Sequence, residues 1–156
     1  MRRLVLLAAL AAVGCGGGGR KFQMAQPIPQ TVKAALFDFM AAVKANDLAR
    51  MGSLWGTERG AAAGWMKPEE LHMRLTVIQK YLQHVGFRTI EGPIDHPTNN
   101  SLKTMRIELQ REGCNAVLPI DIVRVRAGGW LVYDVHLENA GNPAARCPPA
   151  PGGTRP

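Results

Sequence analysis

The stretch Val123-Arg124-Val125-Arg126-Ala127-Gly128-Gly129-Trp130-Leu131-Val132-Tyr133-Asp134-Val135 decides the fold, because it holds two strands and the turn between them. Residues of alternating character flank the glycine pair at 128–129, and this pattern is typical of a β-hairpin. The sequence therefore predicts strands over 117–126 and 130–138. Pro119 lacks a backbone donor, so we expect it near a strand start, a bulge or an edge.

Two more strands are expected before this hairpin. Met105, Ile107 and Leu109 alternate with charged and amide residues, which predicts a strand with one solvated face. A short strand is expected over 87–90, followed by a loop over 95–101 that is rich in turn-forming residues. The strands therefore follow one another closely enough to pair in antiparallel order.

Helical periodicity fills the earlier part of the chain. One apolar stripe runs from Val32 to Val43 and another from Leu71 to Val85, where Gly86 is expected to end the helix. Asp47 is placed to cap a short helix between them, before a Gly- and Ala-rich loop over 56–64. Three helices followed by three or four antiparallel strands predict an α+β domain.

Two segments resemble the nuclear transport factor two-like superfamily. Phe39-Met40-Ala41-Ala42-Val43-Lys44-Ala45-Asn46-Asp47-Leu48 is similar to the family's opening helix and its turn, and the 123–135 hairpin is similar to its terminal strands. The resemblance covers residues 31–138. It implies a cone-like fold in which three N-terminal helices pack on a curved antiparallel sheet of three to four strands. It implies no single activity, because the superfamily includes isomerases, dehydratases, cyclases, docking modules and lipoproteins.

The first residues resemble the signal peptide of a bacterial lipoprotein. A basic pair precedes an apolar run over 4–13, and residues 12–15 resemble a lipobox with Ala12 in place of the usual leucine. The resemblance implies a signal peptide over 1–14 and a lipid on Cys15. Ordinary secretory cleavage just before this point is the alternative. An uncleaved membrane anchor is not expected, because a membrane-spanning helix needs roughly 20 apolar residues and this run is about half as long.

The same resemblance implies a place in the bacterial cell envelope. Gly16 instead of an aspartate follows the predicted lipidated cysteine, which implies the outer membrane, on its periplasmic side. Residues 15–30 contain glycines and prolines that predict a flexible linker, and residues 139–156 predict a Pro- and Gly-rich C-terminal tail. We therefore expect a globular domain that is tethered to a membrane.

The charged residues and the cysteines limit the binding partners and modifications that we expect. The 156-residue chain has 19 Lys and Arg against 12 Asp and Glu, and the basic residues are spread out instead of clustered, so no nucleic-acid partner is expected. The membrane is expected as a partner through the predicted N-terminal lipid. With Cys15 lipidated, Cys114 and Cys147 remain; we expect a disulfide between them, with two free thiols as the alternative. The chain has no HExxH or CxxC spacing, so neither a metal nor a cofactor is expected.

The last hairpin carries the candidate pocket residues. Trp130, Asp134 and His136 share one face of their strand, and a two-residue turn at 128–129 would place Asp121 opposite His136. The family's pocket is lined by the concave face of the sheet, so these four residues are candidate ligand contacts. The alternative is a structural cross-strand pair, worth ~0.2–1 kcal/mol.

Further aromatic, histidine and aspartate positions of interest lie outside the last hairpin. Trp55 and Trp65 frame an apolar loop that is expected either as a lid over a ligand or as part of the core. His72 and His84 are expected in solvent on the third helix. Asp38 is expected in water at the edge of the first helix.

For function, we expect a non-enzymatic module that binds a small apolar ligand or an envelope protein, because no catalytic constellation stands out. The alternative is an isomerase- or dehydratase-like enzyme that uses Asp121, Asp134 and His136. A third hypothesis is a structural envelope lipoprotein. Members of the superfamily commonly dimerise through the sheet, so the resemblance also implies a homodimer.

Overall fold

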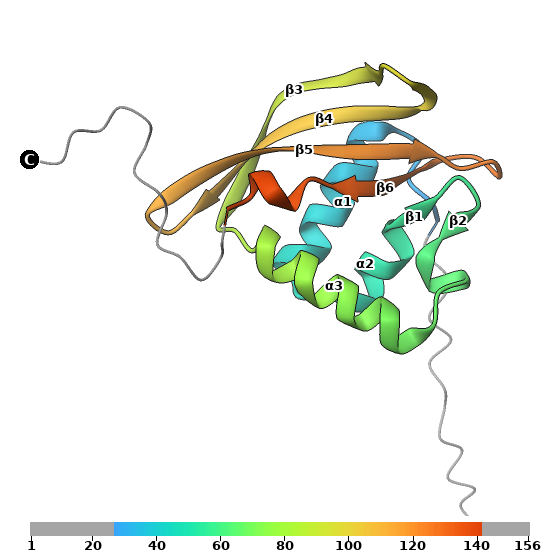
Figure 1. Cartoon of the computed structure of the whole chain (residues 1–156), viewed down its shortest axis with the longest axis horizontal. Helices are drawn as coiled ribbons and strands as arrows, with labels where there is room; N and C mark the ends of the chain where they lie inside the picture. The colour runs from blue at the N-terminus through green and yellow to red at the C-terminus, as the bar shows by residue number, and fades with distance from the viewer. Residues whose placement is uncertain (1–26, 142–156) are drawn as a thin grey trace, which may run out of the picture.

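A computed structural model describes residues 27–141 of the chain. The elements, in chain order, are α1 (Val32–Lys44), α2 (Leu48–Leu54), β1 (Gly56–Thr57), β2 (Gly60–Ala61), a 3-10 turn (Ala62–Gly64), α3 (Pro68–Leu82), β3 (Gly86–His96), β4 (Asn99–Arg111), β5 (Cys114–Arg124), β6 (Trp130–Val135) and a second 3-10 turn (Leu137–Asn139). The long strands form one antiparallel sheet in the order β3-β4-β5-β6, and β1 and β2 form a separate pair (Figure 1). The predicted α+β class is confirmed.

Polar side chains fix the starts of the first two helices. The Oγ1 atom of Thr31 accepts a hydrogen bond from the N–H of Ala34 at 3.1 Å, and Oδ1 of Asp47 accepts one from the N–H of Arg50 at 2.8 Å. Each bond satisfies a donor that has no partner inside the helix. The predicted cap at Asp47 is confirmed.

Helix α3 is shorter than the apolar stripe suggests. It ends at Leu82, and the N–H of Val85 donates to the carbonyl of Gln110 in β4 at 2.9 Å. The chain thus joins the sheet before Gly86, and the Val85 side chain is 56 % exposed. The prediction that the helix continues to Gly86 is wrong, because the backbone N–H of Val85 bonds to strand β4 instead of to a carbonyl of the helix.

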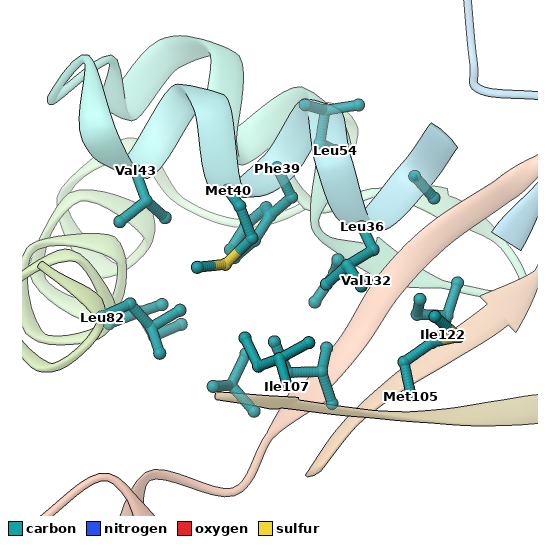
Figure 2. Close-up of a cluster of buried hydrophobic side chains, with 14 of the residues drawn as sticks. Leu36, Phe39, Met40, Val43, Leu54, Leu82, Met105, Ile107, Ile122 and Val132 are labelled. Atoms are coloured by element: carbon teal, nitrogen blue, oxygen red, sulfur yellow. The ribbon is translucent and has the colours of Figure 1, made fainter. Parts of the chain in front are cut away.

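One apolar core joins the helices to one face of the sheet. Leu36 and Met40 of α1 point toward Val132 and Ile107 of the sheet (Figure 2). The cluster takes buried side chains from α1, α2, α3, β4, β5 and β6, and all of its buried members are apolar. Phe39 is fully buried within it. We call this side of the sheet the core face and the opposite side the outer face.

Strand β3 is longer than predicted. It continues through the Gly92-Pro93 pair to His96, with register shifts against β4 that absorb the irregular backbone. His96 pairs with Asn99, so the expected loop over 95–101 is reduced to a tight turn. The glycine and proline interrupt the pairing but do not end the strand.

The expected loop over 56–64 contains the β1–β2 hairpin. A Cβ atom on Gly56 would lie 2.3 Å from the carbonyl oxygen of Gly60, so the two strands approach this closely because residue 56 has no side chain. Trp55, just before the hairpin, forms a parallel bridge with Val132. The hairpin therefore lies beside the end of the large sheet where β5 turns into β6 (Figure 1).

Candidate functional site

The turn between β5 and β6 sets which side chains meet. The N–H of Gly128 donates to the carbonyl of Val125 at 2.9 Å, and the N–H of Val125 donates to the carbonyl of Gly129 at 3.0 Å. Residues 126–128 therefore form a three-residue loop, in which φ of +102° at Gly128 favours glycine. The predicted two-residue turn, and the register built on it, are wrong.

A bulge at Tyr133 changes the register a second time. Asp134, instead of His136, lies opposite Asp121, and Val132 lies in regular register on the other side of Tyr133. The extra residue moves Asp134 to the outer face, where it joins Asp121.

Three candidate pocket residues gather on the outer face. Asp121 is 6 % exposed, and its Oδ1 accepts a hydrogen bond from the Thr104 hydroxyl at 2.6 Å. Its Oδ2 lies 3.1 Å from Nε2 of His136, whose Nδ1 lies 3.0 Å from Oε1 of Glu138. We call Asp121, His136 and Glu138 the histidine clamp. The predicted contact between Asp121 and His136 is therefore present, although the two residues are not paired across the strands.

The histidine clamp favours a charged imidazole. Burial alone would lower the pKa of His136, but hydrogen bonds to Asp121 and Glu138, and the nearby charge of Asp134, raise it above its ordinary value. The pKa of Glu138 is lowered by its own backbone N–H and by His136. Because both ring nitrogens face carboxylates, the arrangement is an electrostatic cross-link that leaves neither nitrogen free to act as a base.

The fourth candidate, Trp130, lies elsewhere. Its side chain packs against the core cluster, and its backbone N–H donates to the carbonyl of Pro29 at 2.8 Å. The structure thus separates Trp130 from Asp121, Asp134 and His136, because the bulge comes after Trp130 in β6. The sequence pattern places all four on one face only if the strand is regular.

A groove of about 830 Å³ lies over the outer face beside the β1–β2 hairpin. We call it the hairpin groove. Its lining comes from the hairpin, the loop before α3, the start of β4 and the ends of β5 and β6; the residues are Thr57, Glu58, Arg59, Gly60, Ala61, Gly64, Trp65, Asn99, Leu102, Val123, Arg126 and Tyr133. None of the four candidate pocket residues belongs to this lining.

Two aromatic side chains line the hairpin groove. Trp65 is 54 % exposed and Tyr133 is 43 % exposed. The indole Nε1 of Trp65 donates to the carbonyl of Gly60 at 3.4 Å, and that of Trp55 donates to the carbonyl of Tyr133 at 3.0 Å. The two tryptophans that frame the expected apolar loop therefore differ in location. Trp55 packs against the core, and Trp65 lines the groove.

The charges in the hairpin groove are unequal. Nη2 of Arg126 lies 3.8 Å from Oε2 of Glu58, and the backbone N–H of Arg126 donates to the backbone carbonyl of Glu58 at 2.9 Å. Arg59 has no carboxylate within ion-pair distance in the described part of the chain. The groove lining therefore carries two guanidinium groups, of Arg59 and Arg126, against the one carboxylate of Glu58.

The two histidines expected on the third helix and Asp38 lie in different environments. His84 is buried, not solvated: its Nδ1 lies 2.7 Å from the carbonyl of Leu82, and burial lowers its pKa against the effect of that bond. His72 is exposed. Asp38 is exposed and lies 3.5 Å from Arg50. Within residues 27–141, no three His, Cys, Asp or Glu side chains are arranged to hold a metal ion.

Two of the three cysteines with predicted modifications lie outside residues 27–141, which the structure describes. Cys114 is half-buried at the start of β5, while Cys15 and Cys147 lie outside the described residues. The lipid on Cys15 and the Cys114–Cys147 disulfide therefore remain predictions.

Comparison of the chain with known protein families, characterised proteins and solved structures finds no match. Between residues 27 and 141, no helix combines the length and apolarity needed to cross a membrane.

Proposed function

We propose that this chain is a lipid-anchored envelope protein whose domain is a non-enzymatic binding module, and that its ligand occupies the hairpin groove. The observation that carries the proposal is the groove itself, which combines a volume typical of ligand sites with exposed aromatic and polar side chains. The membrane tether rests on the resemblance of residues 1–15 to a lipoprotein signal.

The filled core argues for a site outside the space between helices and sheet. The buried polar or charged residues of the described chain are His84 and Asp121, and neither belongs to the core cluster. Ligand sites need a few converging polar groups to fix orientation. The core face offers none, so the outer face is the better location.

We also propose that the domain has the cone-like arrangement of the nuclear transport factor two-like superfamily. The order of three helices before four antiparallel strands supports it, as does the Asp47 cap between the first two helices. The shared fold would supply a scaffold, and function would depend on the groove built on its outside.

The two other expectations receive less support. An enzyme using the Asp/His group would need a free base, but each ring nitrogen of His136 faces a carboxylate. A sheet-to-sheet homodimer would need an apolar outer face, yet β3 and β4 carry cross-strand ion pairs there, Arg88 with Glu108 and Arg106 with Glu91.

Native mass spectrometry of the full-length protein, purified in detergent, tests the binding function. We expect a small-molecule adduct that is lost on denaturation and is absent from Trp65→Ala, because that substitution removes a wall of the groove. Phe37→Ala, which removes an exposed aromatic ring on α1 outside the groove lining, should retain the adduct. A bare mass for the wild type, whose denatured mass still carries a lipid, would instead favour a structural lipoprotein.

A further inference from the structure

The hairpin groove has little apolar surface on its floor. Leu102 and Val123 are 6 % and 1 % exposed, whereas Trp65 and Tyr133 are about half exposed. The exposed apolar surface of the groove therefore comes mainly from side chains other than these two floor residues, including the two aromatic rings, and polar groups lie among them. The groove offers two half-exposed aromatic rings, which suit a ligand with its own flat apolar faces.

Polar groups surround these rings. The carboxamide oxygen of Asn99 accepts a hydrogen bond from the N–H of Ser101 at 2.9 Å, which leaves its amide N–H groups for a ligand. The hydroxyl of Thr57 accepts from the N–H of Arg59 at 3.2 Å and keeps its own donor. Ring faces edged by such donors and acceptors match a sugar, whose C–H faces stack on aromatic rings and whose hydroxyls lie at its edge.

The positive charge of the guanidinium groups in the groove favours a sugar that carries a carboxylate. The guanidinium of Arg126 lies near Glu58, but that of Arg59 has no carboxylate partner among residues 27–141. A guanidinium is matched by a carboxylate, with which it forms two parallel hydrogen bonds.

Building on the proposed binding function, we propose that the hairpin groove binds an acidic oligosaccharide of the uronic-acid type. Its sugar rings stack on Trp65 and Tyr133, and its carboxylate pairs with Arg59. The ligand is thus amphipathic and anionic.

An acidic peptide is the rival that shares this charge. Peptides commonly bind by adding a strand to a free sheet edge. The strands at the groove's hairpin, β1 and β2, have two residues each, and the floor has little exposed apolar surface to receive a side chain. These features favour the saccharide.

Isothermal titration calorimetry of the full-length protein in detergent tests this inference with three probes: tetragalacturonate, maltotetraose as its neutral counterpart, and hexaglutamate. We expect tetragalacturonate to bind most tightly. Trp65→Ala and Arg59→Gln should each weaken it about tenfold, the loss of one well-placed contact. Phe37→Ala and Arg74→Gln, matched changes outside the groove lining, should leave it unchanged.

Each outcome is decisive. If maltotetraose binds as tightly and Arg59→Gln has no effect, the acidic specificity is wrong. If hexaglutamate binds in the groove and no saccharide does, the saccharide inference fails while the binding function stands. If no probe binds and the native mass shows no adduct, both fail. Binding of tetragalacturonate that survives Trp65→Ala and Arg59→Gln would place its site elsewhere.

Discussion

Replacing Phe39 with alanine is expected to lower the free energy of unfolding by about 3–5 kcal/mol, the usual cost of removing a large buried ring. Phe39 has no exposed surface and lies in the core cluster between α1 and the sheet (Figure 2). Alanine would leave a cavity that the surrounding helices and strands cannot fully close. Urea denaturation followed by circular dichroism measures the change.

Phe37 gives a matched control on the same helix. Its ring is 52 % exposed and lies 5.1 Å from the ring of Phe87, centroid to centroid. Phe37→Ala should therefore cost about 1 kcal/mol, the value of one exposed aromatic contact. Equal costs for the two substitutions would show that the core does not lie where α1 meets the sheet.

The second large effect is expected from Asp121→Asn, which removes the buried charge of the histidine clamp. A hydrogen bond to a charged group contributes about 1.5–3 kcal/mol, so the loss near pH 6 should fall in this range. The pKa of His136 should also fall, because the hydrogen bond to Asp121 is a leading cause that raises it. Proton NMR of the imidazole C–H signals, with urea denaturation across pH, measures both quantities.

The sign of the pH dependence follows from the raised pKa of His136. A folded-state pKa above the unfolded value contributes stability that is fully present below about pH 6.5 and is lost as pH rises through the raised pKa. The cost of Asp121→Asn should therefore be larger near pH 6 than near pH 9. Asp134→Asn, which removes a charge but no hydrogen bond to the ring, should lower the pKa less. An unchanged His136 titration in Asp121→Asn would rule out the clamp.

Strong periodicity made much of the fold predictable. The stripe from Val32 to Val43 and the alternation at Met105, Ile107 and Leu109 each mark a face that is buried in the structure. The β1–β2 hairpin was not predictable in this way, because two-residue strands are too short to show alternation. Its signal was the cluster of glycines in residues 56–64, which is equally typical of a loop.

The site was harder to predict, because its geometry depends on single residues. One extra residue in the turn and one bulge at Tyr133 decide which side chains face outward. Asp121 and His136 meet despite both changes, since a histidine side chain reaches beyond its direct partner. Trp65 lines the groove together with the β1–β2 hairpin. Because the hairpin could not be predicted from the sequence, the groove could not be predicted either.

Fluorine NMR of the full-length protein labelled with 5-fluorotryptophan tests the location of the ligand most directly. The chain has three tryptophans, and each reports a different place: Trp65 in the hairpin groove, Trp130 on the core side and Trp55 beside β6. On addition of tetragalacturonate, we expect the Trp65 signal to shift most and the Trp130 signal to stay in place. A shift at Trp130 with none at Trp65 would place binding inside the domain and contradict the groove as the functional site.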